Sequence, residues 1–386
     1  MNMLQDAIRA KDFEKAKEII ALADNPFEEM QEYHITGIYD TLAREKAFEV
    51  IDALIENGAI ELDIYEYDSF NKTIFISLIK NLPSDDESIT YLNDFIPRVQ
   101  SLNDELEGKS LLSLALENEV DVAILKALVD NGCDVNIIDR SEGNLIHQIV
   151  KKYTRTYDKG LSYLDLLYEQ GLDIEKPNVV QETPLHIAVR EHREPYIKWL
   201  LDNGANPNAQ DKDGVSPFYH AVANAIDLDK YTLMREYVTP DFDQKTNSGE
   251  SILYESVRMG CKPELLKLLL EDGADLYETS TNYGNQLNTM DALADKSPEL
   301  LQVVIDSSGF DVNRQDDAGN TLLHKLCDRQ TMHEDKRAKE VYRNVKLLLA
   351  AGADPSIANT SEETPMMIAS NDNLKTKTVE LLLSHK

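Results

Sequence analysis

Apolar residues recur in this sequence at helical spacing, in short blocks that come in pairs. In the clearest block, Leu185, Ala188 and Val189 lie at positions i, i+3 and i+4, which places them on one face of a helix. Thr183 is suited to cap that helix, and Pro184 fits its first position, where a missing N–H costs nothing. The block therefore predicts a short amphipathic helix.

A second amphipathic helix is predicted from about Pro195, after a polar break. Leu200 and Leu201 lie on its apolar face, and Gly204 can adopt the left-handed conformation that ends a helix. The block that begins at Ser251 repeats both halves of this pattern. The sequence thus predicts a helix-turn-helix repeat, with short hairpin-like loops between successive repeats.

The pattern returns along the whole chain at intervals of about 36 residues, a length typical of repeat architectures. Eleven copies begin at residues 2, 36, 73, 110, 144, 183, 216, 251, 288, 321 and 364. The copies in residues 108–386 match one another well, and those in residues 1–107 are degenerate. We expect a single array over residues 1–386, which leaves no room for a separate catalytic domain.

Several of these elements recur in one phase and resemble the ankyrin repeat. They are Thr183-Pro184-Leu185-His186, Leu200-Leu201-Asp202-Asn203-Gly204-Ala205 and Leu268-Leu269-Leu270-Glu271-Asp272-Gly273-Ala274-Asp275. The resemblance implies an all-α ankyrin-repeat solenoid of about eleven helix-turn-helix units. It also implies that hairpin loops and first helices line a concave groove that contacts protein partners.

Composition narrows the class of partner and the compartment. The 386 residues include 39 Lys and Arg against 70 Asp and Glu, a formal charge of −31, which disfavours binding to nucleic acid. No apolar run is long enough to span a membrane, and the first residues lack the pattern of a secretory signal. Three cysteines far apart in sequence form no disulfide framework. We expect a cytoplasmic monomer that does not bind membranes.

Candidate chemistry is sparse. His147, His186 and His324 share one phase, which would suit a metal site or a general base if they met, but they belong to different repeats. We interpret each imidazole as a hydrogen-bonded bridge between neighbouring loops. The three cysteines are interpreted as small buried residues. With no nucleophile motif, phosphate-binding loop or metal motif, we expect no enzyme activity, no metal and no cofactor. An enzyme with an unrecognised site is the alternative.

Basic residues gather where the first helix of each repeat ends. The two positions after each seven-residue motif hold nine basic and five acidic residues among 22, against the acidic trend of the chain. In the ankyrin family these positions look into the groove, so they indicate a basic stripe for partner binding. The alternative is that cations simply favour helix C-termini, by about 0.3–1 kcal/mol each.

The candidate partner-binding residues follow from this stripe, from the cationic insertion in the fifth repeat and from the hairpin tips. They are Lys151, Lys152, Tyr153, Arg155, Tyr157, Arg190, Lys212, Arg258 and Tyr283. The function predicted from the sequence is a non-catalytic scaffold or adaptor that binds an acidic or extended segment of a protein. The alternative is an acidic inhibitor, or polyanion mimic, acting on a basic protein or a nucleic-acid enzyme.

Overall fold

The chain is divided into two compact units, residues 1–188 and 189–386, and each is described by itself. The computed structural model describes residues 3–28, 30–152, 156–224 and 226–385. The division falls inside α11 (Pro184–Arg190). The expectation that one array covers residues 1–386 stays a prediction.

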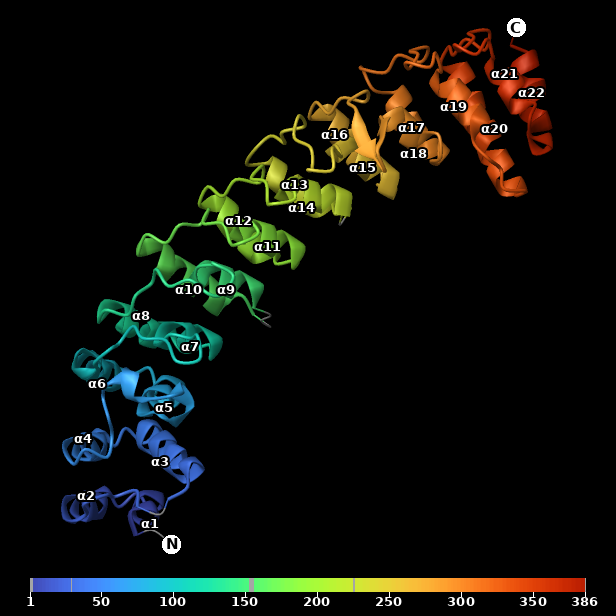
Figure 1. Ribbon diagram of the computed structural model, residues 1–386. Helices are drawn as coiled ribbons and strands as arrows, with labels where there is room; N and C mark the ends of the chain where they lie inside the picture. Colours follow the sequence, from blue (N-terminus) through green and yellow to red (C-terminus); the bar gives the residue numbers. More distant parts are fainter. Residues whose placement is uncertain (1–2, 29, 153–155, 225, 386) are drawn as a thin grey trace. The chain divides into compact units, whose positions relative to one another are not determined.

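Five helix pairs follow one another in the N-terminal unit (Figure 1). The first helices of these pairs are α1 (Met3–Arg9), α3 (Glu32–Arg44), α5 (Ile74–Asn81), α7 (Leu111–Glu117) and α9 (Leu145–Lys151). The second helices are α2 (Phe13–Leu22), α4 (Phe48–Glu56), α6 (Asp86–Phe95), α8 (Val122–Asp130) and α10 (Asp158–Glu169). Three short 3₁₀ turns, η1 (Ile64–Glu66), η2 (Phe70–Lys72) and η3 (Ile96–Arg98), lie between them.

The C-terminal unit continues the pattern after α12 (Glu194–Asp202). Its first helices are α13 (Pro217–Tyr219), which runs on into the π-helical η4 (His220–Asn224), and then α15 (Ile252–Met259), α17 (Thr289–Leu293), α19 (Leu322–Asp328) and α21 (Pro365–Ala369). The second helices are α14 (Leu228–Arg235), α16 (Pro263–Glu271), α18 (Pro298–Ile305), α20 (Asp335–Ala350) and α22 (Thr376–Leu383), with the 3₁₀ turn η5 (Asn373–Lys375) before the last.

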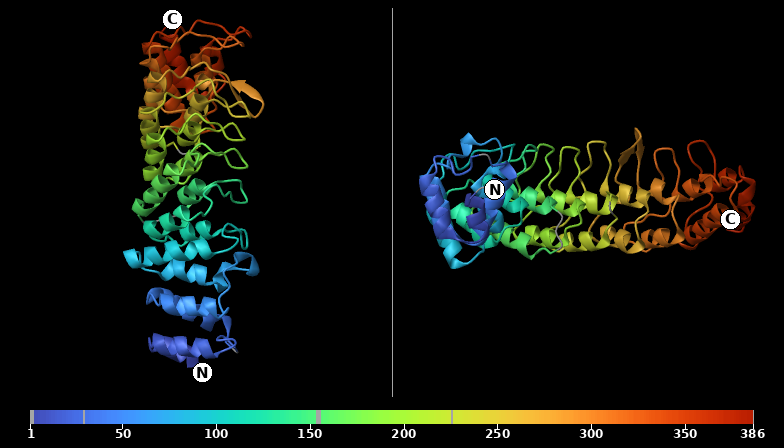
Figure 2. Two further views of the ribbon diagram at one scale, coloured as in Figure 1. Left: turned by 90° about the vertical axis from the view of Figure 1, so that its left-hand side faces the viewer. Right: turned by 90° about the horizontal axis from the view of Figure 1, so that it is seen from below.

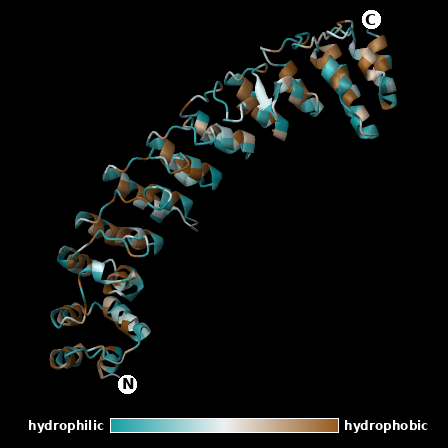
Figure 3. Cartoon of the chain, viewed as in Figure 1, coloured by the Kyte–Doolittle hydropathy of each residue, from teal (hydrophilic) through white to brown (hydrophobic). Residues whose placement is uncertain are grey.

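Packing within each unit runs from one pair to the next. In the N-terminal unit α3 contacts α5 and α5 contacts α7, while α6 contacts α8 and α8 contacts α10. The C-terminal unit has the same scheme, since α17 contacts α19 and α18 contacts α20. Apolar residues gather on the helix faces that meet (Figure 3). A single pair cannot bury its apolar face, so each pair depends on its neighbours for stability.

The loops between pairs project to one side of the helices, as seen for the C-terminal unit in Figure 2. One of them forms an antiparallel hairpin of β1 (Ser280–Asn282) and β2 (Asn285–Leu287). Gly204 ends α12 as predicted, with φ of 93°, and Gly132 and Gly273 follow α8 and α16 in the same way, with φ of 101° and 105°. The predicted all-α fold of helix pairs joined by hairpin-like loops is confirmed.

Two acidic or charged stretches between predicted helices take part in helices. In the acidic stretch from Pro83 to Glu87, residues 83–85 form a loop, as their composition suggests, and Asp86 and Glu87 begin α6, which Asp85 caps by accepting a hydrogen bond from Ser88 N at 3.0 Å. The repeat that begins at residue 321 is longer than the others, which suggests an insertion between its helices at about Thr331 to Val341. Seven of these eleven residues instead lengthen α20, which begins at Asp335 and has 16 residues.

Candidate partner-binding groove

A groove of about 640 Å³ lies on the N-terminal unit, between the first helices α7 and α9 and the loops that precede them. Its lining mixes charged residues with small polar ones. The lining residues are Glu107, Gly108, Lys109, Ser113, Glu117, Asp139, Arg140, Ser141, Gln148, Lys151 and Lys152. All of them belong to the N-terminal unit.

The loop that carries Arg140 is held by its own hydrogen bonds. Asp139 Oδ1 accepts from the amides of Ser141 (2.8 Å) and Gly143 (3.0 Å), and Asp139 N donates to Gly143 O at 2.9 Å. Ser141 O accepts from Val179 N in the next loop at 2.7 Å. An Asp at the first position of a turn is favoured because its carboxylate satisfies the turn amides. Arg140 is therefore presented from a fixed backbone.

Cations outnumber carboxylates in this groove, although the whole chain is strongly acidic. Lys109 Nζ lies 2.7 Å from Glu117 Oε2. Arg140 and Lys151 are exposed and have no ion-pair partner in the described part of the chain. Gly108, with φ of 75°, leaves room for the guanidinium, since a Cβ at this glycine would lie 3.2 Å from Arg140 Nη2. Two uncompensated positive charges thus face the groove.

Lys152 lines the groove and also contacts the preceding helix pair. Its Nζ donates to the carbonyl of Glu117 (2.6 Å) and lies 3.1 Å from Glu119 Oε1, so it caps the C-terminus of α7 in the preceding pair. Lys296 and Lys375 repeat the arrangement: their Nζ atoms donate to Arg258 O at 2.6 Å and Cys327 O at 2.7 Å. Part of the basic enrichment therefore serves the last carbonyl groups of neighbouring helices, which carry partial negative charge.

The structure places the other candidates apart. Arg258 is paired with Glu255 on its own helix, through Nε to Oε2 at 2.6 Å. Lys212 and Tyr283 lie exposed on loops of the C-terminal unit, and Tyr157 precedes α10. Tyr153 and Arg155 lie outside the described residues, and Arg190 belongs to the C-terminal unit. The stripe formed by Lys151, Lys152, Arg155 and Arg190 therefore stays a prediction.

The candidate residues predicted from the sequence include neither Arg140, which lies at one of the hairpin tips, nor Lys109. Lys109 immediately precedes Ser110, the N-cap of α7, and Arg140 follows Asp139, the first residue of the turn. Both residues precede the first helix of their repeat, whereas Lys151 is the last residue of α9. Lys109, Arg140 and Lys151 line one groove only because neighbouring repeats stack, and the sequence of a single repeat does not show this.

The histidine bridges are confirmed at two of the three predicted positions. His147 Nδ1 accepts from Asn144 N at 3.2 Å, so the ring proton sits on Nε2, which donates to Glu182 O at 3.2 Å. His324 makes the same pair of bonds, to Thr321 N at 3.1 Å and Glu363 O at 3.2 Å. Burial lowers the pKa of His147 to about 4, so this imidazole is neutral at pH 7.

The cysteines are buried, as predicted. Burial raises the pKa of the Cys133 and Cys327 thiols to about 12, which leaves them protonated and poorly nucleophilic. Among the described residues, no group of His, Cys, Asp or Glu side chains is arranged to hold a metal ion. No helix in the described ranges is both long and apolar enough to cross a bilayer.

Comparisons with known proteins agree with this architecture. Residues 112–211 and 147–237 match the family described as ankyrin repeats (3 copies). The crystal structure of the ankyrin repeat domain of Bcl-3 has a TM-score of 0.50 at 22% identity, covering 64% of this chain and 100% of that chain. Because the identity is low, this likeness supports the fold alone.

Two curated relatives extend the match in sequence. The mouse B-cell lymphoma 3 protein homolog is 26% identical over 199 residues, which cover 51% of this chain and 42% of the relative. The NAD-dependent deacetylase sir2B of Dictyostelium discoideum is 25% identical over 386 residues, covering 96% of this chain and 46% of the relative. The chain thus spans less than half the length of either, and the expectation that it is not an enzyme stays a prediction. The helix pairs, the bridging histidines and the family match over residues 112–237 together show that this chain contains ankyrin repeats.

Proposed function

We propose that this protein is a non-catalytic adaptor that binds another protein through the groove of its N-terminal unit. Ankyrin repeats generally mediate protein–protein interaction. The loops around the groove are held by main-chain and Asp139 hydrogen bonds before any partner arrives. A preformed surface avoids part of the entropy that flexible binders lose on association.

The occupant proposed for the groove is an acidic, extended segment of the partner. This rests on one observation, that Arg140 and Lys151 are exposed, uncompensated cations in a chain of net charge −31. A cation that is already paired gives little to an incoming carboxylate, whereas an unpaired guanidinium can bind it with two hydrogen bonds. A local positive region also selects against basic partners.

Reversing both charges, Arg140→Glu with Lys151→Glu, is expected to weaken binding of the partner by at least about tenfold. The measurement is affinity capture from a lysate, followed by titration of the purified captured protein. Lys15→Glu with Lys126→Glu is the matched control, because both lysines are exposed on second helices, α2 and α8, and the change in net charge is identical. Binding to wild type and to the control should agree.

Higher salt should weaken binding to wild type and narrow the gap to the groove variant, because exposed charges are screened. Equal binding by wild type and the groove variant at low salt would contradict the proposal. A captured set of strongly basic proteins, bound equally by all three forms, would instead support the acidic-inhibitor alternative.

A further inference from the structure

Four pairs of neighbouring loops are joined by a main-chain hydrogen bond within their own unit. Each bond runs from an amide of one loop to a carbonyl of the preceding loop. The bonds are Val179 N to Ser141 O (2.7 Å), Asn247 N to Asp213 O (2.8 Å), Thr281 N to Gly249 O (2.8 Å) and Thr360 N to Ala318 O (3.0 Å). Among the described residues, no main-chain bond joins the hairpin of β1 and β2 to the following loop, residues 311–320. This junction shares that feature with the one between the loops of residues 104–109 and 139–143.

The register of the hairpin shows which main-chain groups are left without a partner in the following loop. Tyr283 and Gly284 form its two-residue turn, with φ of 48° and 79°, and Thr281 pairs with Gln286. Next to a two-residue turn, this pair is the one without cross-strand hydrogen bonds, so its main-chain groups point outward. The outward-pointing amide of Thr281 donates to Gly249 O in the preceding loop. The N–H and C=O of Gln286 point to the opposite side, along an unpaired strand edge.

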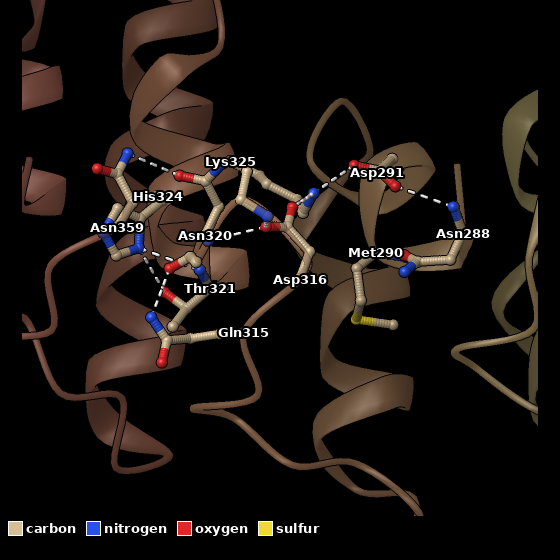
Figure 4. A network of polar contacts seen from close by, with 12 residues as sticks. Asn288, Met290, Asp291, Gln315, Asp316, Asn320, Thr321, His324, Lys325 and Asn359 are labelled. Atoms are coloured by element: carbon tan, nitrogen blue, oxygen red, sulfur yellow. Dashed lines mark hydrogen bonds and ion pairs between the residues drawn. The ribbon is translucent and has the colours of Figure 1, made fainter. Parts of the chain in front are cut away.

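The side chains at this junction also depart from the repeat pattern. Asp291 stands at the motif position where His147 and His324 bridge to the next loop, and its Oδ2 accepts from Asn288 N at 2.9 Å. The bridge is made instead by Lys325, whose Nζ lies 2.5 Å from both Asp291 Oδ1 and Asp316 Oδ2 (Figure 4). At this junction, ion pairs from Lys325 to two aspartates therefore replace the histidine hydrogen bonds seen in other repeats.

A groove of about 430 Å³ opens beside this network, between β2 and the loop of residues 314–320. Gln286, Leu287 and Met290 are among the lining residues, as is Arg314, whose guanidinium stacks 3.7 Å from the ring centre of Tyr277. Three carboxylates line the groove, those of Asp291, Asp316 and Asp317, against two cations. Lys325 is shared between two of the carboxylates, and Asp317 is exposed with no ion-pair partner in the described residues.

We propose that this groove binds an extended segment of a partner protein as an added β-strand on the free edge of β2. The main chain of Gln286 would supply the hydrogen bonds that an edge strand offers to an incoming strand. Because carboxylates outnumber cations in the groove, we expect the bound segment to carry a basic side chain that pairs with Asp317. This site is separate from the groove that contains Arg140 and Lys151, and it selects a segment of opposite charge.

Two pairs of variants isolate the strand edge and the charge. Gln286→Pro removes the outward amide and, with the side chain, the hydrogen bond from Gln286 Nε2 to Thr281 Oγ1, but it removes no main-chain hydrogen bond inside the hairpin, because proline is tolerated at such edge positions. Gln286→Ala is its control, since it loses the same side chain but keeps the amide. Asp317→Lys reverses the exposed charge, and Asp213→Lys makes the same change at the exposed tip of another loop.

The probe is a displayed library of random short peptides, selected on the full chain and counter-selected on the Gln286→Pro chain. The expected result is enrichment of peptides in which a basic residue is flanked by β-branched ones. Their affinity should fall by at least about tenfold in Gln286→Pro and in Asp317→Lys, and stay within about twofold in both controls. Hydrogen exchange should show new protection of the Gln286 amide when a selected peptide is bound.

Two results would overturn the proposal. One is that no enriched peptide distinguishes wild type from Gln286→Pro. The other is that selected peptides lose affinity equally with Gln286→Ala and Gln286→Pro. The double variant Arg140→Glu and Lys151→Glu should leave these peptides bound as tightly as wild type, so failure of this site and failure of the proposed adaptor groove are separate outcomes.

Discussion

Replacing Leu323 by alanine is expected to lower the free energy of unfolding by about 2–5 kcal/mol. Leu323 is 0% exposed in α19, which packs against α17, α20 and α21. The substitution removes buried methyl groups and leaves a cavity that rigid neighbouring helices fill only in part. Urea unfolding followed by circular dichroism measures the loss.

The matched control is Leu22→Ala in α2, because this leucine is 89% exposed and its truncation should change stability by no more than about 0.5 kcal/mol. Since repeat pairs are stabilised by their neighbours, hydrogen exchange in Leu323→Ala should quicken most in the helices that pack around α19. Equal destabilisation by the two substitutions would show that the helix faces are not buried as described.

Acid is expected to remove about 3 kcal/mol of stability through His147 alone. Its pKa is about 4 when folded, against an ordinary value of about 6.5 when unfolded. Between about pH 4 and 6.5, His147 is protonated in the unfolded chain but stays neutral in the folded chain. The contribution is therefore complete above about pH 6.5 and is lost as the pH falls towards 4. Protonation would also place a second N–H against Asn144 N, which already donates to Nδ1.

His147→Gln isolates this effect from the titration of the many carboxylates. The stability difference between wild type and this variant, measured by urea unfolding at several pH values, should favour wild type most at pH 7. It should shrink by about 3 kcal/mol as the pH reaches about 4. The exposed His333 provides the control, through His333→Gln. A difference that is independent of pH would contradict the buried, neutral imidazole.

The repeat scaffold was predictable because the residues of each repeat are enough to indicate where its helices begin and end. Pro184 and Pro263 are predicted and observed as the first residues of α11 and α16, since proline at that position needs no donor. The bridging histidines were predictable from their common phase. The π-helical η4 was not, because nothing in residues 220–224 distinguishes a π-turn from an ordinary helix.

The candidate sites were less predictable, because they depend on contacts between residues some 35 or more positions apart. The sequence alone indicates that Lys152 is a free cation. In the structure it caps α7 by donating to Glu117 O, 35 residues earlier in the chain. Arg140 reads as one residue of a polar turn, yet it lies unpaired beside Lys109 and Lys151 in one groove. Charge pairing across a stack is set by the relative placement of neighbouring loops, which the repeat pattern alone does not specify.

Site-specific photo-crosslinking shows whether a partner protein is bound in the groove between first helices and loops. A photoreactive residue in place of Gln148, which lines the groove, is compared with one in place of Lys126, exposed on α8. We expect discrete protein adducts from position 148 that disappear with Arg140→Glu and Lys151→Glu. Adducts from position 126 and none from position 148 would contradict this expectation.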